Sequence, residues 1–287
     1  MSDRTWLVTG TSTGIGRALT ATLLDRGDRV AATVRDPAAL APLAAHAGDR
    51  LRPVTLDVTD HAGIEQAVDE TFSAFGRVDA VVSNAGYGLF GAAEEVSDEQ
   101  IQRQLATNLL GPIRLARAVL PRFRAQGGGR FIQLSSVGGQ TTLPHLSLYH
   151  ASKWGVEGFF ESLAAEAEPF GIQVTIVEPG TVPTDFAGRS GDVAPPLPAY
   201  ADTPADRVRQ VLEQGVLPAP GDPRKIARAI ADLAALERAP RRLALGSDAF
   251  GLIQSALRAR LAELEEQKDA ALSADADAPA ADTLSSN

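Results

Sequence analysis

The sequence predicts an α/β protein: a single domain built on a doubly wound parallel sheet of seven strands, with helices on both faces. Short apolar runs alternate along the chain with longer stretches in which apolar residues recur every three to four positions, as strands and helices alternate around a parallel sheet. The apolar runs are nearly continuous, which is typical of strands buried on both faces. The length of 287 residues suits one large α/β domain or two small ones, and we expect one.

Seven runs are expected to form strands: residues 6–10, 29–34, 51–58, 78–86, 129–136, 172–180 and 241–246. The expected helices are residues 14–27, 37–46, 64–75, 98–124, 149–169 and 248–268. Pro112 is expected to bend the long helix, because proline has no backbone N–H to donate. These elements place the domain at residues 1–268, and residues 269–287, rich in Ala, Asp and Ser, are expected to form a disordered tail.

Two segments depart from the alternation. Residues 187–205 are rich in Gly, Pro and Ala without a clear period, and we expect residues 187–215 to form a lid over a site. The helix expected at 248–268 is amphipathic, with an apolar stripe formed by Phe250, Ile253, Leu257, Leu261 and Leu264. We expect this stripe to pack on the same domain; contact with a partner is the alternative.

Composition excludes several classes of function. The net charge of −9 argues against a nucleic-acid-binding surface, which needs a basic stripe. The absence of cysteine excludes disulfides, thiolate metal sites and cysteine nucleophiles, and the four histidines lack the spacing of metal ligands, so no metal is expected. The sequence shows no apolar signal region and no run long enough to span a bilayer, so a soluble cytoplasmic protein is expected.

A glycine-rich segment, TGTSTGIG at residues 9–16, joins the first expected strand to the first expected helix. Gly10, Gly14 and Gly16 allow a tight turn and a close approach by a phosphate group. The N-terminus of the helix adds free N–H groups and a partial positive charge, which also favour an anion. At this point a purely structural turn is the alternative.

A second pattern is YHASK at residues 149–153, within an expected helix. Tyr149 and Lys153 stand four residues apart and therefore share one face of that helix. A nearby ammonium favours the phenolate, so Lys153 is expected to lower the pKa of Tyr149 and make it a usable acid and base. On this pattern alone, a buried core tyrosine is the alternative. His150 points away from that face and is expected to be structural or exposed.

The glycine spacing G-x-x-x-G-x-G resembles that of the short-chain dehydrogenase/reductase family, and other motifs of the family occur in the expected order. They are LDV with Asp57, SNAG at 83–86, TNLLGP with Asn108, LSS with Ser135 and Ser136, YHASK, and PGTVPT at 179–184. ATVRD and SNAGYG resemble the branch that includes 17β-hydroxysteroid and retinol dehydrogenases. The resemblance implies a Rossmann fold and an NAD(P)-dependent carbonyl reductase or alcohol dehydrogenase.

The resemblance implies four catalytic residues, Asn108, Ser136, Tyr149 and Lys153. Tyr149 would be the general acid in reduction and the base in oxidation, and Lys153 would also bond the nicotinamide ribose. Ser136 would polarise the substrate carbonyl, and Asn108 would hold a water that links Lys153 to solvent. Ser136 is chosen over Ser135 because the family commonly places this serine 13 residues before the tyrosine, where Ser136 stands.

The same motifs imply a cofactor site. Its expected residues are Gly10, Ser12, Thr13, Gly14, Ile15, Gly16, Arg35, Asp57, Val58, Asn84, Ala85, Gly86, Tyr149, Lys153, Pro179, Gly180, Val182 and Thr184. NADP(H) is expected in preference to NAD(H), because Val34 stands where NAD enzymes of this fold usually carry an acid, and Arg35 follows it. A guanidinium can pair with a 2′-phosphate. A surface ion pair between Arg35 and Asp36 is the alternative.

The substrate pocket is expected at the carboxyl ends of the strands. Its expected residues are Tyr87, Leu89, Phe90, Leu143, His145, Leu146 and Phe186. They are mostly apolar and include no Arg or Lys, which favours a neutral hydrophobic ketone or aldehyde; His145 could face the substrate or lie on a surface loop. The resemblance also implies a homo-oligomer, either a dimer or a tetramer. A non-catalytic dinucleotide sensor and an epimerase on the same scaffold are the alternative functions.

Overall fold

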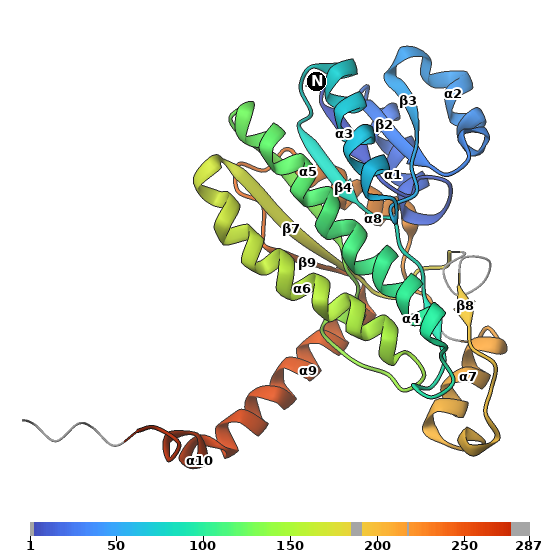
Figure 1. The fold of residues 1–287 in the computed structure, drawn as a ribbon, viewed down its shortest axis with the longest axis vertical. Helices are drawn as coiled ribbons and strands as arrows, with labels where there is room; N and C mark the ends of the chain where they lie inside the picture. The colour runs from blue at the N-terminus through green and yellow to red at the C-terminus, as the bar shows by residue number, and fades with distance from the viewer. Residues whose placement is uncertain (1–2, 185–190, 217, 277–287) are drawn as a thin grey trace, which may run out of the picture.

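A computed structural model describes residues 3–184, 191–216 and 218–276 of the protein. At its centre is a sheet of seven strands in the order β3-β2-β1-β4-β6-β7-β9 (Figure 1). The strands are β1 Thr5–Val8, β2 Arg29–Val34, β3 Leu51–Thr55, β4 Ala80–Ser83, β6 Gly129–Leu134, β7 Ile172–Pro179 and β9 Arg242–Leu245. Every neighbouring pair is parallel. The predicted parallel sheet of seven strands is therefore confirmed.

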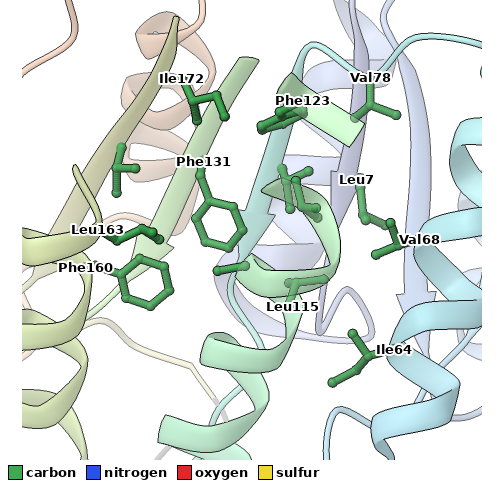
Figure 2. Close-up of a cluster of buried hydrophobic side chains, with 14 of the residues drawn as sticks. Leu7, Ile64, Val68, Val78, Leu115, Phe123, Phe131, Phe160, Leu163 and Ile172 are labelled. Atoms are coloured by element: carbon green, nitrogen blue, oxygen red, sulfur yellow. The ribbon is translucent and has the colours of Figure 1, made fainter. Parts of the chain in front are cut away.

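Helices cover both faces of the sheet. Their bounds are α1 Gly14–Asp25, α2 Ala41–Ala47, α3 His61–Phe75, α4 Asp98–Leu105, α5 Gly111–Ala125, α6 Ser147–Ala167, α7 Pro204–Glu213, α8 Pro223–Leu233, α9 Ser247–Glu266 and α10 Lys268–Leu272. α3, α5 and α6 pack on one face, in a core that contains Leu7, Phe131 and Phe160 (Figure 2). α1 and α8 pack on the other face, against Trp6 and Val8. Successive residues of β1 thus enter opposite cores, as the two-residue period of a strand requires.

The strand order reverses between β1 and β4. β2 and β3 lie on one side of β1, whereas β4 begins the other half of the sheet. In open α/β sheets the ligand binds outside the carboxyl ends of the strands at such a reversal. The glycine-rich segment follows β1 and the SNAG segment contains the end of β4, so both predicted cofactor motifs border this crevice.

Two features of the helices differ from the prediction. α7 and α8 are absent from the predicted set. α8 begins after Asp222, whose side chain accepts the N–H of Arg224 at 2.8 Å, and it buries one apolar face in the second core. The predicted long helix is divided into α4 and α5 by a widened π-helical turn, Ala106–Leu110. This turn precedes Pro112, whose missing N–H leaves the carbonyl of residue 108 without an α-helical donor.

A second, two-stranded sheet joins the segment after β4 to the segment before α7. β5 (Leu89–Phe90) pairs in parallel with β8 (Asp192–Val193). Asp192 donates its N–H to the carbonyl of Gly88 at 2.9 Å, and Ala194 donates to Phe90 at 2.8 Å. The pairing fixes part of the expected lid against the segment that follows β4, and α7 lies within the same lid region.

α9 projects away from the body of the protein (Figure 1). The expectation that its apolar stripe packs on the same domain is wrong, because Phe250, Leu257, Leu261 and Leu264 are 62%, 51%, 55% and 64% exposed. α10 occupies the first residues of the segment expected to be disordered, and residues 277–287 lie outside the described residues. In the parts of the chain that the structure describes, no helix has both the length and the apolar character needed to cross a membrane.

Candidate active site

The SNAG segment fastens the glycine-rich loop to the end of β4. The side-chain amide of Asn84 donates to the carbonyls of Thr9 at 2.9 Å and Gly10 at 3.0 Å. In return, the Thr9 hydroxyl accepts the backbone N–H groups of Asn84 and Ala85, at 2.9 and 3.1 Å. The structure thus places Asn84 between the two strand ends, where it sets the shape of the loop.

Close packing explains two of the three glycines. Gly10 has a φ of +69°, and a Cβ there would lie 2.8 Å from the Cα of Ala85. A Cβ on Gly16 would lie 2.3 Å from the carbonyl oxygen of Gly10. Gly16 therefore lets α1 approach its own loop, which differs from the expected role of admitting a phosphate. Gly86 is similarly close to Asn108, with 3.2 Å between an added Cβ and Oδ1.

The N-terminus of α1 can accept an anion. Thr13 precedes the helix in an extended conformation, its side chain makes no capping hydrogen bond, and the first turn carries no acidic residue. Ser12 and Thr13 are exposed, and Ile15 packs beside the second core. Thr184, from the loop after β7, faces Gly14, since a Cβ there would lie 3.5 Å from its Cγ2. This cradle fits the pyrophosphate of a dinucleotide.

Arg35 and Asp57 follow two neighbouring strands, β2 and β3. Arg35 is exposed after β2, and within the described residues no carboxylate forms an ion pair with it. Asp36 accepts the N–H of Ala38 at 2.9 Å, so the alternative pair with Arg35 does not form. Asp57 accepts from the N–H and the hydroxyl of Thr59, at 2.9 and 2.7 Å, and these bonds hold the pKa of its carboxyl below the usual value. Val58 is half-buried beside it.

The loop after β7 is held from the C-terminal side. Gly180 donates its N–H to the carbonyl of Leu245 at 2.9 Å, and Thr181 donates to a carboxylate oxygen of Asp248 at 2.6 Å. Pro179 is buried at the end of β7, and Val182 packs beside the second core. Asp248, which sequence reasoning did not identify, thus connects the start of α9 to the predicted cofactor loop.

Ser136 and Tyr149 meet at the carboxyl end of the sheet. Ser136 follows β6 and begins a 3-10 turn, Val137–Gly139, and its hydroxyl oxygen accepts the N–H of Gly138 at 3.0 Å. Tyr149 lies in the first turn of α6, and the two side chains are joined by a hydrogen bond. Because the Ser136 oxygen already accepts from the backbone, its hydrogen is available for Tyr149 or for a carbonyl oxygen.

Burial sets the pKa values of Tyr149 and Lys153. It raises the pKa of Tyr149 to about 12, while the hydrogen bond with Ser136 acts in the opposite direction. Burial also lowers the pKa of Lys153 to about 8, opposed by the charge of Glu157. The expectation that Lys153 lowers the pKa of Tyr149 is therefore wrong for this structure. Lys153 donates to the carbonyl of Leu134 at 3.0 Å, and its nitrogen lies 5.9 Å from the centre of the tyrosine ring.

Asn108 lies in the π-helical turn and is 1% exposed. Its Oδ1 accepts the N–H of Tyr87 at 3.1 Å, and its Nδ2 donates to the carbonyl of the same residue at 2.8 Å. Nδ2 also lies 3.5 Å from the hydroxyl of Ser152 on α6. The side chain thus clamps the backbone just beyond SNAG.

His150 is buried and structural. Its Nδ1 lies 2.8 Å from the carbonyl of Gly138, and its Nε2 accepts the N–H of Leu143 at 2.9 Å. Burial lowers its pKa below the usual value, which favours the neutral ring with the proton on Nδ1. His150 therefore joins the turn that carries Ser136 to the loop before α6.

Four of the expected pocket residues belong to two apolar clusters, one of which includes Tyr149. Phe90 and Leu146 pack with Tyr149, and Val208 and Leu212 of α7 cover them. The other two, Tyr87 and Leu89, belong to a neighbouring cluster. Of the remaining three, Leu143 is 52% exposed, His145 lies in a polar cluster, and Phe186 lies outside the described residues.

A buried polar cluster lies behind these clusters. Glu95 accepts from Arg209 of α7 at 2.5 Å and from the N–H groups of Leu197 and Ala92, at 2.9 and 2.7 Å. Burial favours the neutral acid, but these donors outweigh it and hold the pKa of Glu95 below its usual value. The Nδ1 of His145, in a residue with a φ of +71°, is 3.9 Å from Glu95. His145 is therefore neither on the surface nor beside Tyr149 in the apolar cluster.

A second buried cluster adjoins Lys153. Glu157 on α6 and Glu178 on β7 both lie near the guanidinium of Arg242, at 3.1 and 3.3 Å. Gln140 donates to both carboxylates at 3.2 Å. Burial and the charge of Glu157 raise the pKa of Glu178 to about 7. Across the described residues, no group of His, Asp and Glu has the arrangement of a metal site.

Comparisons with known proteins agree with this geometry. The model of the short chain dehydrogenase family matches residues 4–193. Oxidoreductase BOA17 of Botryotinia fuckeliana is 39% identical over 85% of this chain and 89% of its own. Human retinol dehydrogenase 8 is 38% identical over 66% of this chain and 62% of its own.

Solved structures show the same likeness. A short-chain dehydrogenase from Streptomyces avermitilis has a TM-score of 0.89 at 38% identity, covering 96% of this chain and 100% of its own. The alcohol dehydrogenase of Thermococcus sibiricus, complexed with 5-hydroxy-NADP, has a TM-score of 0.69 at 27% identity, covering 84% and 95%. The chain belongs to the short-chain dehydrogenase family and is an NAD(P)-dependent oxidoreductase.

Proposed function

We propose that the protein reduces a neutral hydrophobic ketone or aldehyde with NADPH, or oxidises the corresponding alcohol, with Tyr149 as the general acid and base. The observation that carries this proposal is the environment of Tyr149. Its hydroxyl is hydrogen bonded to Ser136, its pKa is raised by burial, and apolar side chains cover its ring. Burial keeps the phenol protonated, so a proton is present beside the substrate, and the hydrogen bond from Ser136 opposes the raised pKa and favours release of that proton to a carbonyl oxygen.

Each residue has one task in this proposal. The bound dinucleotide supplies the hydride. Ser136 donates to the substrate oxygen and stabilises the negative charge that develops there, and Tyr149 supplies the proton. Lys153 binds the nicotinamide ribose, and Asn108 takes part in proton relay through its backbone carbonyl, for which the π-helical turn and Pro112 leave no α-helical donor.

A preference for NADP(H) is supported by Arg35. Its guanidinium is exposed and forms no ion pair with Asp36. Arg35 directly follows the apolar residue Val34. It can therefore pair with a 2′-phosphate, whereas no acid stands at the end of β2 to bind a 2′-hydroxyl. The T. sibiricus relative, whose structure contains 5-hydroxy-NADP, agrees with this choice.

The substrate class is supported by the cluster around Tyr149. Phe90, Leu146, Val208 and Leu212 are apolar, and the nearby charge of Arg209 is neutralised by Glu95. A charged substrate would lose its hydration without a partner there. We also propose that the protein is cytoplasmic and forms a homo-oligomer, a dimer or a tetramer.

The test is a screen of aromatic ketones, steroids and aldehydes with NADPH, using the wild type, Tyr149→Phe and the control Tyr200→Phe. We expect Tyr149→Phe to abolish turnover while NADPH binding, followed by fluorescence, stays within about twofold; Tyr200→Phe should remain active. Activity confined to acyl-carrier or CoA-linked substrates would contradict the neutral-ketone proposal. NADPH binding by the wild type without turnover of any compound would favour the sensor, and inversion of an alcohol without net oxidation would favour the epimerase.

A further inference from the structure

α9 is attached to the body along one side, between Asp248 and Arg260. Asp248 binds the loop after β7, and the guanidinium of Arg260 lies 4.9 Å from the centre of the Trp154 ring on α6. From Leu261 to residue 276 every residue is exposed. The end of the helix beyond Arg260 therefore extends into solvent without a partner among the described residues, as its projection in Figure 1 shows.

The exposed side of α9 carries a continuous apolar stripe. Phe250, Leu257, Leu261 and Leu264 are separated by seven, four and three residues, so they lie along one side of the helix. Each is more than half exposed. Burial of one such side chain contributes about 1.5–3 kcal/mol of free energy, so burying the whole stripe against a partner would strongly favour association. Single exposed leucines are common on protein surfaces, but an aligned row on a projecting helix is typical of an interface.

The charges beside the stripe identify the partner that fits it. Arg258 precedes Leu261, whereas Glu263, Glu265 and Glu266 follow it. Within the described part of the chain, none of these four forms an ion pair. A two-fold axis near Leu261 would bring the basic half of one helix beside the acidic half of a second, identical helix. A parallel pairing would place like charges together instead.

We propose that α9 pairs antiparallel with α9 of a second copy of this chain, about a two-fold axis near Leu261. The contact is isologous: the leucines of each stripe pack against those of the other, and Arg258 of one copy pairs with Glu265 of the other. This inference rests on the proposed homo-oligomer and names the surface that forms it.

Charge disfavours a lipid surface as the occupant. Ser247–Glu266 contains two arginines and four acidic residues, and three of those acids lie beyond Arg260. Helices that lie on membranes usually carry basic residues on their polar face, because cellular lipids are neutral or anionic. The acidic end of α9 is repelled by such a surface. It is complementary to the basic segment of a second copy, which contains Arg258 and Arg260.

Cysteine crosslinking can measure the geometry, because the chain contains no cysteine of its own. Under mild oxidation we expect Leu261→Cys to give a disulfide-linked dimer at micromolar protein concentration, since its position is close to the axis. Phe250→Cys should stay monomeric on a non-reducing gel, because residues 250 of the two copies would be about 30 Å apart at a rise of about 1.5 Å per residue. Crosslinking at both positions would overturn the antiparallel pairing.

Sedimentation of the full chain tests the surface itself. Leu261→Glu should raise the dissociation constant at least tenfold, whereas Leu236→Glu, at a residue 44% exposed elsewhere on the surface, should not. Arg258→Glu and Glu265→Arg should each weaken the dimer, and the two together should restore it. An oligomer insensitive to Leu261→Glu would overturn this inference but not the proposed homo-oligomer, whereas a wild-type monomer would overturn both. Co-sedimentation with phosphatidylcholine–phosphatidylserine vesicles that Leu261→Glu abolishes would replace it with membrane binding.

Discussion

The ammonium of Lys153 lies 5.9 Å from the centre of the Tyr149 ring, but its hydrogen bond is made to a backbone carbonyl. The two side chains, proposed to be catalytic, share one turn of α6 and are both buried, so the fold holds a phenol and an amine where neither is well solvated. Such groups usually reduce stability in exchange for function.

Lys153→Met should therefore make the protein more stable at pH 7, by about 2 kcal/mol, while abolishing activity. The pKa of Lys153 is about 8 when folded and 10.5 in the reference state, so the unfolded chain binds more protons between these values. Wild-type stability then rises as the pH increases from 8 to 10.5, and the advantage of the variant disappears over that range. Urea unfolding at pH 7 and pH 10 measures this. The exposed Lys225→Met is the control, and an equal gain in both variants would contradict the explanation.

The two hydrogen bonds of His150 can be separated by substitution. Asparagine can replace Nδ1 as the donor to Gly138, and glutamine can replace Nε2 as the acceptor from Leu143. Because the N–H of Gly138 fixes the Ser136 hydroxyl, we expect His150→Gln to lower kcat by about tenfold, with KM little changed. His150→Asn should retain kcat and raise KM, since it frees the loop next to Leu146. The exposed His46→Asn serves as the control, and equal losses in the two His150 variants would mean that the ring only fills space.

Arg35→Ala should raise KM for NADPH by at least about tenfold and leave KM for NADH within about twofold, because only NADPH carries the 2′-phosphate that the guanidinium would bind. Steady-state kinetics with both cofactors measure the ratio. Arg224→Ala, at an exposed position on α8, controls for a general effect of lost charge. Higher catalytic efficiency of the wild type with NADH would contradict the assigned preference.

Glu178→Gln should stabilise the protein at pH 8 by about 2 kcal/mol. The pKa of Glu178 is about 7 when folded, against a reference of 4.5, so the folded state binds more protons between these values. Stability contributed by its protonated form is therefore lost as the pH rises from 4.5 to 7, and the glutamine avoids that loss. Thermal unfolding at pH 4.5 and pH 8 should show a gain only at the higher pH. The exposed Glu237→Gln, as the control, should show no gain in stability at either pH.

Sequence reasoning succeeded where a motif is local. The apolar runs were enough to predict the strands of the sheet. Gly10, Tyr149 and Lys153 lie near the ends of adjoining strands, so motifs of a few residues were enough to predict which segments surround them. The direction of the Tyr149 pKa shift could not be predicted, because it depends on how fully α7 covers the ring.

Contacts between segments far apart in the chain could not be predicted from the sequence. Glu95 and Arg209 are 114 residues apart, and neither belongs to a recognisable motif. The stripe on α9 was identified, but an amphipathic pattern shows only that one side of a helix avoids water. Whether that side packs on the same chain depends on the direction in which the chain leaves β9. α8 had a detectable signal, an Asp-Pro start followed by Ile226 and Ile230 one turn apart.

The second sheet has a consequence for the timing of catalysis. α7 covers Tyr149 through Val208 and Leu212 and follows β8 in the same segment, so uncovering the ring by a movement of this segment would break both the pair between Arg209 and Glu95 and the pairing of β8 with β5. Substrate entry and product departure then require local unfolding of hydrogen-bonded structure, which is slow compared with side-chain motion. We expect product residence time to limit turnover, so NADPH deuterated at the transferred position should leave kcat almost unchanged. In Arg209→Met, the product should leave faster, so deuterated NADPH should lower kcat measurably.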